Sequence, residues 1–387
     1  MKEIDVTNSI KYIGVDDKTL DLFESQYEIP NGISYNSYVI LDEKVALMDT
    51  VDARATDEWL NNLEKAVDGQ TVDYLIISHL EPDHAANIKK IIERYPNMKV
   101  VGNNKTFSML PQFFDIDLTE KKIVVAEGDE LNLGSHTLQF FMAPMVHWPE
   151  VMVTYEKTEK VLFSADGFGK FGANDVEEEW TSEARRYYCN IVGKYGSPVQ
   201  VLLKKAAGLD IEIICPLHGP VLKENLSYYI DKYNTWSSYE PEIDGVLVAY
   251  ASIHGNTANA AKKMASILEA KGAKDVLLLD LSREDISKAV MNAFCYSKLI
   301  VAGASYDGGV FPCMEEFLLH LKSKNYQKRT VGIIENGSWA PMAGKVMKEI
   351  LEKMRNITIC DNMVSIKSVA KENDIEKMHQ LANEILK

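Results

Sequence analysis

The spacing of apolar runs changes near residue 240, and this change constrains the fold most. Before it, short apolar runs follow one another with few helical stretches between them, from SYNSYVILDEKVALMDT to IEIICPLHG. This pattern predicts two packed sheets with helices outside. From Gly245, the runs GVLVAYAS, DVLLLDLS, KLIVAGAS and TVGIIENG alternate with helical segments, as in a parallel doubly wound sheet. The polar segment Tyr233 to Asp244 lies between the two patterns. We therefore expect an α/β protein with two domains, residues 1–243 and 244–387.

Composition excludes several classes of protein. The net charge of -15 argues against nucleic acid and anionic membranes as partners. The sequence has no signal-peptide pattern at its start and no apolar stretch of the roughly 18 residues that a spanning helix needs. The five cysteines show no C-x-x-C spacing, which disfavours a zinc knuckle, a cysteine-ligated cluster or a disulfide framework. We expect a cytoplasmic protein with reduced cysteines.

The segment SHLEPDHA, residues 78–85, is dense in side chains that bind metals. It follows the apolar run Tyr74 to Ile77, so its side chains are expected just beyond a buried strand. Three further candidates also follow apolar runs, each at the end of an expected strand. The candidate donors are His79, Glu81, Asp83, His84, His147, Asp166 and His218. They exceed what one tetrahedral zinc needs and suit two metals bridged by a carboxylate. Carboxylates with imidazoles and no thiolate are compatible with iron, manganese or zinc, so the metal stays open.

A second set of loops follows strands of the C-terminal half. SIHGNT, residues 252–257, opens a helix after the first of these strands and can present hydroxyl and N–H groups to a phosphate. GASYDGGVFP and ENGSWAP, residues 303–312 and 335–341, follow later strands. Ligands of doubly wound sheets bind beyond the carboxyl ends of the strands, which is where these loops are expected.

Together these motifs resemble the flavodiiron proteins, also called A-type flavoproteins. The pattern His-x-Glu-x-Asp-His, with MVHWPE, FSADGFG and CPLHGP, is similar to their metallo-β-lactamase-like domain, which is an αββα sandwich. Glu81 stands where the zinc hydrolases of that superfamily have histidine. By this resemblance His79, Glu81 and His147 bind one iron, Asp83, His84 and His218 the other, and Asp166 bridges them. In some members of this family, the residue that matches His84 does not bind the metal directly.

The C-terminal half resembles flavodoxin and implies an FMN site. Ser252, His254, Gly255, Asn256 and Thr257 match the phosphate loop, although flavodoxins often have threonine or an aromatic residue where His254 stands. Two further loops would border the ring, with the indole as a stacking face. Their residues are Ser305, Tyr306, Asp307, Gly308, Gly337, Ser338 and Trp339.

The resemblance implies a reductase that passes electrons through FMN to a diiron centre. Dioxygen would be reduced to water, nitric oxide to nitrous oxide, or both, in protection against oxygen or nitric oxide stress. It also implies a head-to-tail homodimer, with a dimer of dimers as a larger form, and rubredoxin or another small donor, because the sequence contains no fused rubredoxin module. Many relatives place a histidine near the irons where Ser25 stands here. Tyr195 is the candidate catalytic residue beside the bound gas, with simple packing as the alternative.

Two other functional classes remain open at this point. The N-terminal domain could be a binuclear zinc hydrolase whose flavodoxin-like partner only carries electrons. The chain could also be a redox-inert regulatory or scaffold protein. Glu81 and the paired flavin loops count against the first, and the intact donor set counts against the second.

Overall fold

Two compact units make up the computed structural model, which describes residues 4–387. The first unit contains Met1–Tyr187 and Ser197–Asn234, and the second contains Tyr188–Gly196 and Thr235–Lys387. The sequence analysis placed the boundary at residues 243 and 244, and those domain limits stay a prediction. Residues 188–196 belong to the second unit, although the residues before and after them in the sequence belong to the first unit.

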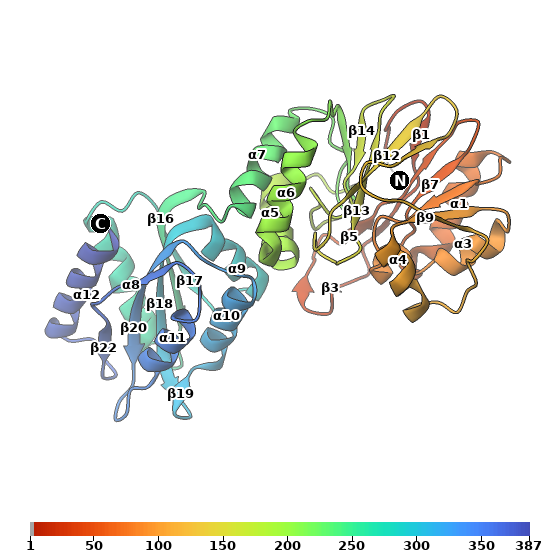
Figure 1. The fold of residues 1–387 in the computed structure, drawn as a ribbon. Helices are drawn as coiled ribbons and strands as arrows, with labels where there is room; N and C mark the ends of the chain where they lie inside the picture. Colours follow the sequence, from red (N-terminus) through yellow and green to blue (C-terminus); the bar gives the residue numbers. More distant parts are fainter. Residues whose placement is uncertain (1–3) are drawn as a thin grey trace. The chain divides into compact units, whose positions relative to one another are not determined.

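The first unit contains two packed sheets, as expected (Figure 1). The six-stranded sheet has the order β1-β6-β7-β8-β9-β10, and the five-stranded sheet has the order β11-β12-β13-β14-β15. The strands of the first sheet are β1 (Ile10–Tyr12), β6 (Tyr38–Ile40), β7 (Ala46–Met48), β8 (Tyr74–Ile76), β9 (Lys99–Gly102) and β10 (Lys122–Val124). Those of the second are β11 (Glu130–Asn132), β12 (Thr137–Met142), β13 (Met152–Glu156), β14 (Val161–Phe163) and β15 (Ile213–Cys215).

Apolar side chains from both sheets form one core between them. Tyr38 and Met48 of the first sheet belong to the same buried cluster as Phe140 and Phe163 of the second. Helices α1 (Thr56–Val67), α3 (Ile88–Arg94) and α4 (Asn104–Met109) lie outside the six-stranded sheet (Figure 1). The strands of the six-stranded sheet face the other sheet on one side and helices on the other (Figure 1). Because both sides are buried, their sequences are short, nearly continuous apolar runs.

The second unit is a parallel sheet covered by helices on both faces, which confirms the predicted doubly wound fold. Its order is β17-β16-β18-β20-β21, the flavodoxin-like order in which the first strand lies between the second and the third. The strands are β16 (Ile243–Ala251), β17 (Val276–Asp280), β18 (Tyr296–Tyr306), β20 (Arg329–Asn336) and β21 (Ile357–Ile359), with β19 (Gly309–Val310) and β22 (Val364–Ile366) paired to β18 and β20.

Five helices of the second unit divide between the two faces of this sheet. Helices α8 (Asn256–Ala270) and α12 (Glu372–Ile385) pack against each other on one face (Figure 1). Helices α9 (Ile286–Cys295), α10 (Pro312–Ser323) and α11 (Ala343–Leu351) pack on the other. Among residues 4–387, we find no helix with the length and apolar character that crossing a lipid bilayer requires.

Candidate functional site

Metal-binding side chains of the first unit meet where strands of its two sheets end. His79 follows β8, Asp166 follows β14 and His218 follows β15, while His147 lies between β12 and β13. Because β8, β14 and β15 end close together at one edge of the sandwich, residues far apart in sequence come within a few ångströms. The structure thus brings all seven predicted donors together in two groups. These are His79, Glu81, His147 and Asp166, and Asp83, His84 and His218.

A short helix after β8 presents three of the donors from one turn of chain. Glu81 is the N-cap of α2 (Pro82–Ala85), and Pro82 occupies the first helical position. The fixed φ of proline at this position favours the start of a helix. The helix then carries Asp83 and His84 toward the second group, whereas Glu81 stays with the first.

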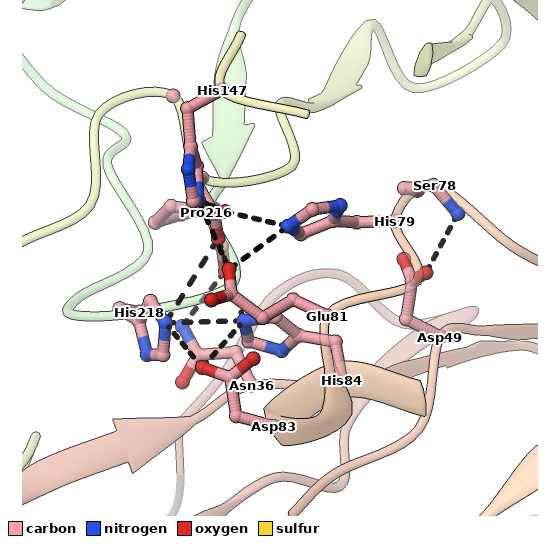
Figure 2. Close-up of polar contacts among 12 residues, drawn as sticks. Asn36, Asp49, Ser78, His79, Glu81, Asp83, His84, His147, Pro216 and His218 are labelled. Atoms are coloured by element: carbon pink, nitrogen blue, oxygen red, sulfur yellow. Dashed lines mark hydrogen bonds and ion pairs between the residues drawn. The ribbon is translucent and has the colours of Figure 1, made fainter. Parts of the chain in front are cut away.

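Donor atoms of the first group face one another at short range (Figure 2). Glu81 Oε2 lies 3.0 Å from His147 Nε2 and 3.1 Å from His79 Nε2. Asp166 Oδ2 lies 3.2 Å from His147 Nε2 and 3.4 Å from His79 Nε2. Two ligands about 2.0–2.2 Å from one metal lie about 3 Å apart when the angle between them is near 90°. The spacing therefore fits a shared cation.

The second group repeats this arrangement around Asp83. Its Oδ2 lies 3.2 Å from His218 Nε2 and 3.4 Å from His84 Nε2. The other oxygen of Asp166, Oδ1, lies 3.4 Å from His84 Nε2 and 3.9 Å from His218 Nε2. One oxygen of Asp166 thus faces each group, which is the geometry of a bridging carboxylate.

The residues present fit a pair of metal ions. Within the described chain, both carboxylate oxygens of Asp83, Oδ1 of Asp166 and Nε2 of His147 are buried and form no hydrogen bond. Buried polar atoms without partners are rare in proteins unless an ion or water satisfies them. Seven oxygen and nitrogen donors without a thiolate match the chemistry of iron or manganese, and also of zinc.

The carboxylates and imidazoles of the site shift one another's pKa values, and each favours the charged form of the other. Burial by itself would raise the pKa of Asp166, but its close contacts with the His147 and His84 rings hold it well below its usual value. Burial would lower the pKa of His147, but its ion pairs with Asp166 and Glu81 raise it to about 9. In this site a proton and a metal compete for the same imidazole nitrogens, because a ligand must be deprotonated.

Two residues that sequence reasoning missed hold the ligand loops. Asn36 donates from Nδ2 to the carbonyls of Pro216 (2.8 Å) and Gly219 (2.7 Å), on either side of His218 (Figure 2). Asp49, which follows β7, accepts from the backbone N–H of Ser78 at 2.7 Å. Burial raises the pKa of Asp49 to about 6. Asp49 was detectable as an acid at a strand end, whereas no local signal marks Asn36.

A tyrosine other than the predicted one lies against the metal-binding groups. The ring of Tyr187 is 5.5 Å from that of His218, and its side chain is almost fully buried. Burial, followed by the charges of Asp166, Asp83 and Glu81, raises the pKa of Tyr187 well above its usual value. The hydroxyl therefore stays protonated. Tyr195 lies in the 3-10 turn Gly193–Tyr195 of the second unit, so its role beside the gas stays a prediction.

The second unit has a cavity of about 530 Å³ beyond the carboxyl ends of β16, β18 and β20. All of the predicted flavin contacts line it except Ser252 and Gly255. Residues not predicted from sequence also line it, and the segment after β22 contributes one of them. They are Ile253, Ala304, Asn336, Ala340, Met342 and Ser368.

Backbone geometry explains the loops around this cavity. Gly255, the N-cap of α8, has a φ of 89°, which favours glycine, and its N–H donates to Ser252 Oγ at 3.1 Å. These two residues therefore shape the loop. Asp307 and Gly308 both have positive φ between the paired strands β18 and β19, as the two central residues of a type I′ hairpin require.

The cavity residues fit an aromatic cofactor that carries a phosphate. The side chain of Trp339 is 93% exposed and so offers an indole face free for stacking. At the other end, the N-terminus of α8 offers N–H groups and the Thr257 side chain to an anion. Ser305 lines the cavity and also joins two loops, because its Oγ accepts from the N–H groups of Met342 and Ala343.

Comparison with known proteins finds similar proteins along nearly the whole chain. The family described as ODP family beta lactamase matches residues 33–219, which include the seven donors. The anaerobic nitric oxide reductase flavorubredoxin of Vibrio vulnificus is 27% identical over 87% of this chain and 70% of its own length. An uncharacterized protein of Methanocaldococcus jannaschii is 29% identical over 99% of this chain and 98% of its own.

Solved structures show the same fold along the chain. Rubredoxin oxygen:oxidoreductase from Desulfovibrio gigas superposes with a TM-score of 0.93 at 27% identity, covering 99% of this chain and 97% of that one. A variant of the flavo di-iron protein from Thermotoga maritima gives a TM-score of 0.89 at 26% identity, covering 100% and 98%. The metallo-β-lactamase-like fold and the flavodoxin-like fold are both confirmed. The chain thus shares its two folds with relatives named as flavorubredoxin, rubredoxin oxygen:oxidoreductase and flavo di-iron protein, and it is similar to the flavodiiron proteins along nearly its whole length.

Proposed function

We propose that this protein is an FMN- and diiron-dependent reductase of dioxygen, nitric oxide or both. Its relatives indicate an oxidoreductase, and they are named for nitric oxide and for oxygen as substrates. The observation that carries the proposal is the geometry of Asp166, which faces one donor group with each carboxylate oxygen. A pair of irons would supply gas binding and electron transfer to the gas, and FMN would accept and pass on electrons.

The residues of the chain provide binding, orientation and exclusion of water. His79, Glu81 and His147 would hold one iron, and Asp83, His84 and His218 the other, with Asp166 between them. Phe23, Tyr35 and Tyr187 pack around the His218 ring and keep that side of the site apolar. The Tyr187 ring packs beside that of His218, and its protonated hydroxyl is our candidate hydrogen-bond donor at the metal site.

The overall reactions balance with electrons from a separate donor. One dioxygen takes four electrons and four protons to give two waters, and two nitric oxides take two electrons and two protons to give nitrous oxide and water. A small protein such as rubredoxin would supply the electrons, and a head-to-tail homodimer, or a dimer of dimers, would bring one subunit's flavin to the partner subunit's metals. The proposal includes a cytoplasmic location and protection against oxygen or nitric oxide stress.

Anaerobic reduction of the flavin followed by addition of each gas tests this function. We expect a flavin absorbance band, about two irons per chain, and rapid reoxidation with water or nitrous oxide as the product. Rates with the two gases decide the substrate. Two zinc ions per chain with hydrolysis of a thioester or phosphodiester would instead support a binuclear hydrolase, which the family relationship does not favour. Metals that leave the reduced flavin unoxidised would contradict the proposal.

A further inference from the structure

The outer nitrogens of the histidines in the metal site have different partners. Each of His79, His84, His147 and His218 directs Nε2 at the carboxylates. In His79, the opposite nitrogen, Nδ1, lies 2.9 Å from Glu150 Oε1, and both side chains are 0% exposed. The partner of a ligand's second nitrogen decides which nitrogen binds the metal and how basic that nitrogen is.

In the second group, no outer histidine nitrogen has a carboxylate partner among the contacts of the described residues. Nδ1 of His218 donates to the backbone carbonyl of Ser34 at 2.7 Å, which is a neutral acceptor. Nδ1 of His84 is buried and forms no hydrogen bond with any residue of the described chain. Only the first of the two groups therefore has a histidine whose outer nitrogen faces a carboxylate, as far as the contacts of residues 4–387 show.

Glu150 is held in place independently of the metals. Its Oε1 also accepts the backbone N–H of Leu80 at 2.8 Å, and its own backbone carbonyl accepts from Asn103 Nδ2 at 2.7 Å. An oxygen that accepts two N–H donors suits an ionised carboxylate. The side chain thus fixes the turn that carries His79 and also places a negative charge behind the ring.

We propose that Glu150 is a positioning residue that makes the His79 position the tighter of the two metal positions. The carboxylate fixes the ring with Nε2 facing inward and increases the basicity of that nitrogen. Glu81 and Asp166 add two anionic oxygens to the same position. The His84 position has no comparable outer charge, so the two ions bind with unequal affinity. This inference rests on the proposed metal-dependent function and adds an order of filling to it.

The test is an anaerobic calorimetric titration of metal-free protein with Fe²⁺. We expect two steps in the wild type, and in Glu150→Gln a first step weakened by about 10–100-fold, the usual effect of losing an outer partner of a ligand. Glutamine keeps an acceptor for the Leu80 N–H and removes the charge. Glu335→Gln is the matched control, because Glu335 is also buried, accepts a backbone N–H (from Gly344) and lies outside every group of potential metal donors in the described chain. It should titrate like the wild type.

Unchanged affinities in Glu150→Gln would overturn the inference while leaving the proposed function intact. A wild type that binds no Fe²⁺ would instead contradict the proposed function itself. If Glu150→Gln does not fold, Co²⁺ provides a test without it. The visible spectrum at one equivalent of Co²⁺ should be unaffected by Asp83→Asn and altered by Glu81→Gln. The reverse result would place the first ion in the other position and refute the proposed order.

Discussion

Nε2 of His84 lies 3.1 Å from Nε2 of His218 in the first unit. Both rings are buried, and both of these nitrogens also face Asp83 Oδ2. Two imidazole lone pairs repel each other at this distance, so either a proton or a cation must lie between them. In the metal-loaded protein the pair is explained most simply if both residues are ligands of one ion.

We therefore expect His84→Ala to lose the ion at this position. Iron content should fall from about two toward one per chain, because affinity at the position drops by more than the roughly 10–100-fold typical of an outer partner. Metal analysis after gel filtration measures this. His379→Ala, a change at a histidine outside both donor groups, serves as the control. Full iron content in His84→Ala would show that His84 is not a direct ligand.

Replacing Asn36 should loosen the loop that carries His218. Asn36→Ala removes the two hydrogen bonds to the carbonyls of Pro216 and Gly219, which then stay buried without that donor. The expected loss is about 2–4 kcal/mol in the free energy of unfolding of metal-free protein, measured by urea denaturation. Excess Fe²⁺ should restore part of it, since a ligand that binds only the folded state stabilises it. A variant as stable as the wild type would show that water replaces the amide fully.

The two candidate tyrosines can be separated by removing one hydroxyl at a time. Tyr187→Phe should slow turnover of at least one gas by tenfold or more, in keeping with the rough scale of proton-donor effects. The flavin and iron contents should stay unchanged. Tyr195→Phe tests the sequence-based prediction in the same assay. Unchanged turnover of both gases would remove that tyrosine from the mechanism.

Trp339 should contribute to flavin affinity and little to folding. Because its side chain is 93% exposed, Trp339→Ala breaks few contacts within the protein. Loss of a stacking face should raise the dissociation constant of FMN about tenfold, which corresponds to roughly 1.4 kcal/mol. Fluorescence titration of flavin-free protein measures this, and thermal unfolding of the same sample should show no change. A lower melting temperature without loss of affinity would contradict the stacking role.

Acid should weaken the contact between Asp42 and His136. Burial would raise the pKa of Asp42, but hydrogen bonds from the backbone and ring of His136 hold it well below its usual value. A lowered folded-state pKa means that this stabilisation is complete above the unfolded value near 3.8 and is lost as the pH falls through the folded value. Asp42→Asn should be roughly 2 kcal/mol less stable at pH 7. The difference from the wild type should shrink below pH 4, and a constant difference would show that Asp42 is not the titrating group.

Much of the site could be predicted from sequence because its residues are grouped by local patterns. Glu81, Asp83 and His84 share one turn of chain with His79, and each remaining donor follows an apolar run. Strand ends are recognisable in sequence, and ligands of such folds gather there. The flavin loops were recognisable for the same reason, because each of them follows an apolar run of the C-terminal half.

Other parts of the site had no local signal. The contacts of Asn36 span residues far along the chain, and Glu150 is distinguished from other acids only by the ring that it faces. Tyr187 and Tyr195 are both tyrosines in the same stretch, and only packing shows that Tyr187 contacts His218.

The amino-acid sequence alone indicated which residues are candidate metal donors, because short-range spacing and apolar periodicity can be read along the chain. Tertiary structure alone decided which oxygen of Asp166 faces each of the two groups, and which outer partner each histidine has. Those properties depend on distances between side chains from different strands, and pairing of the strands sets those distances.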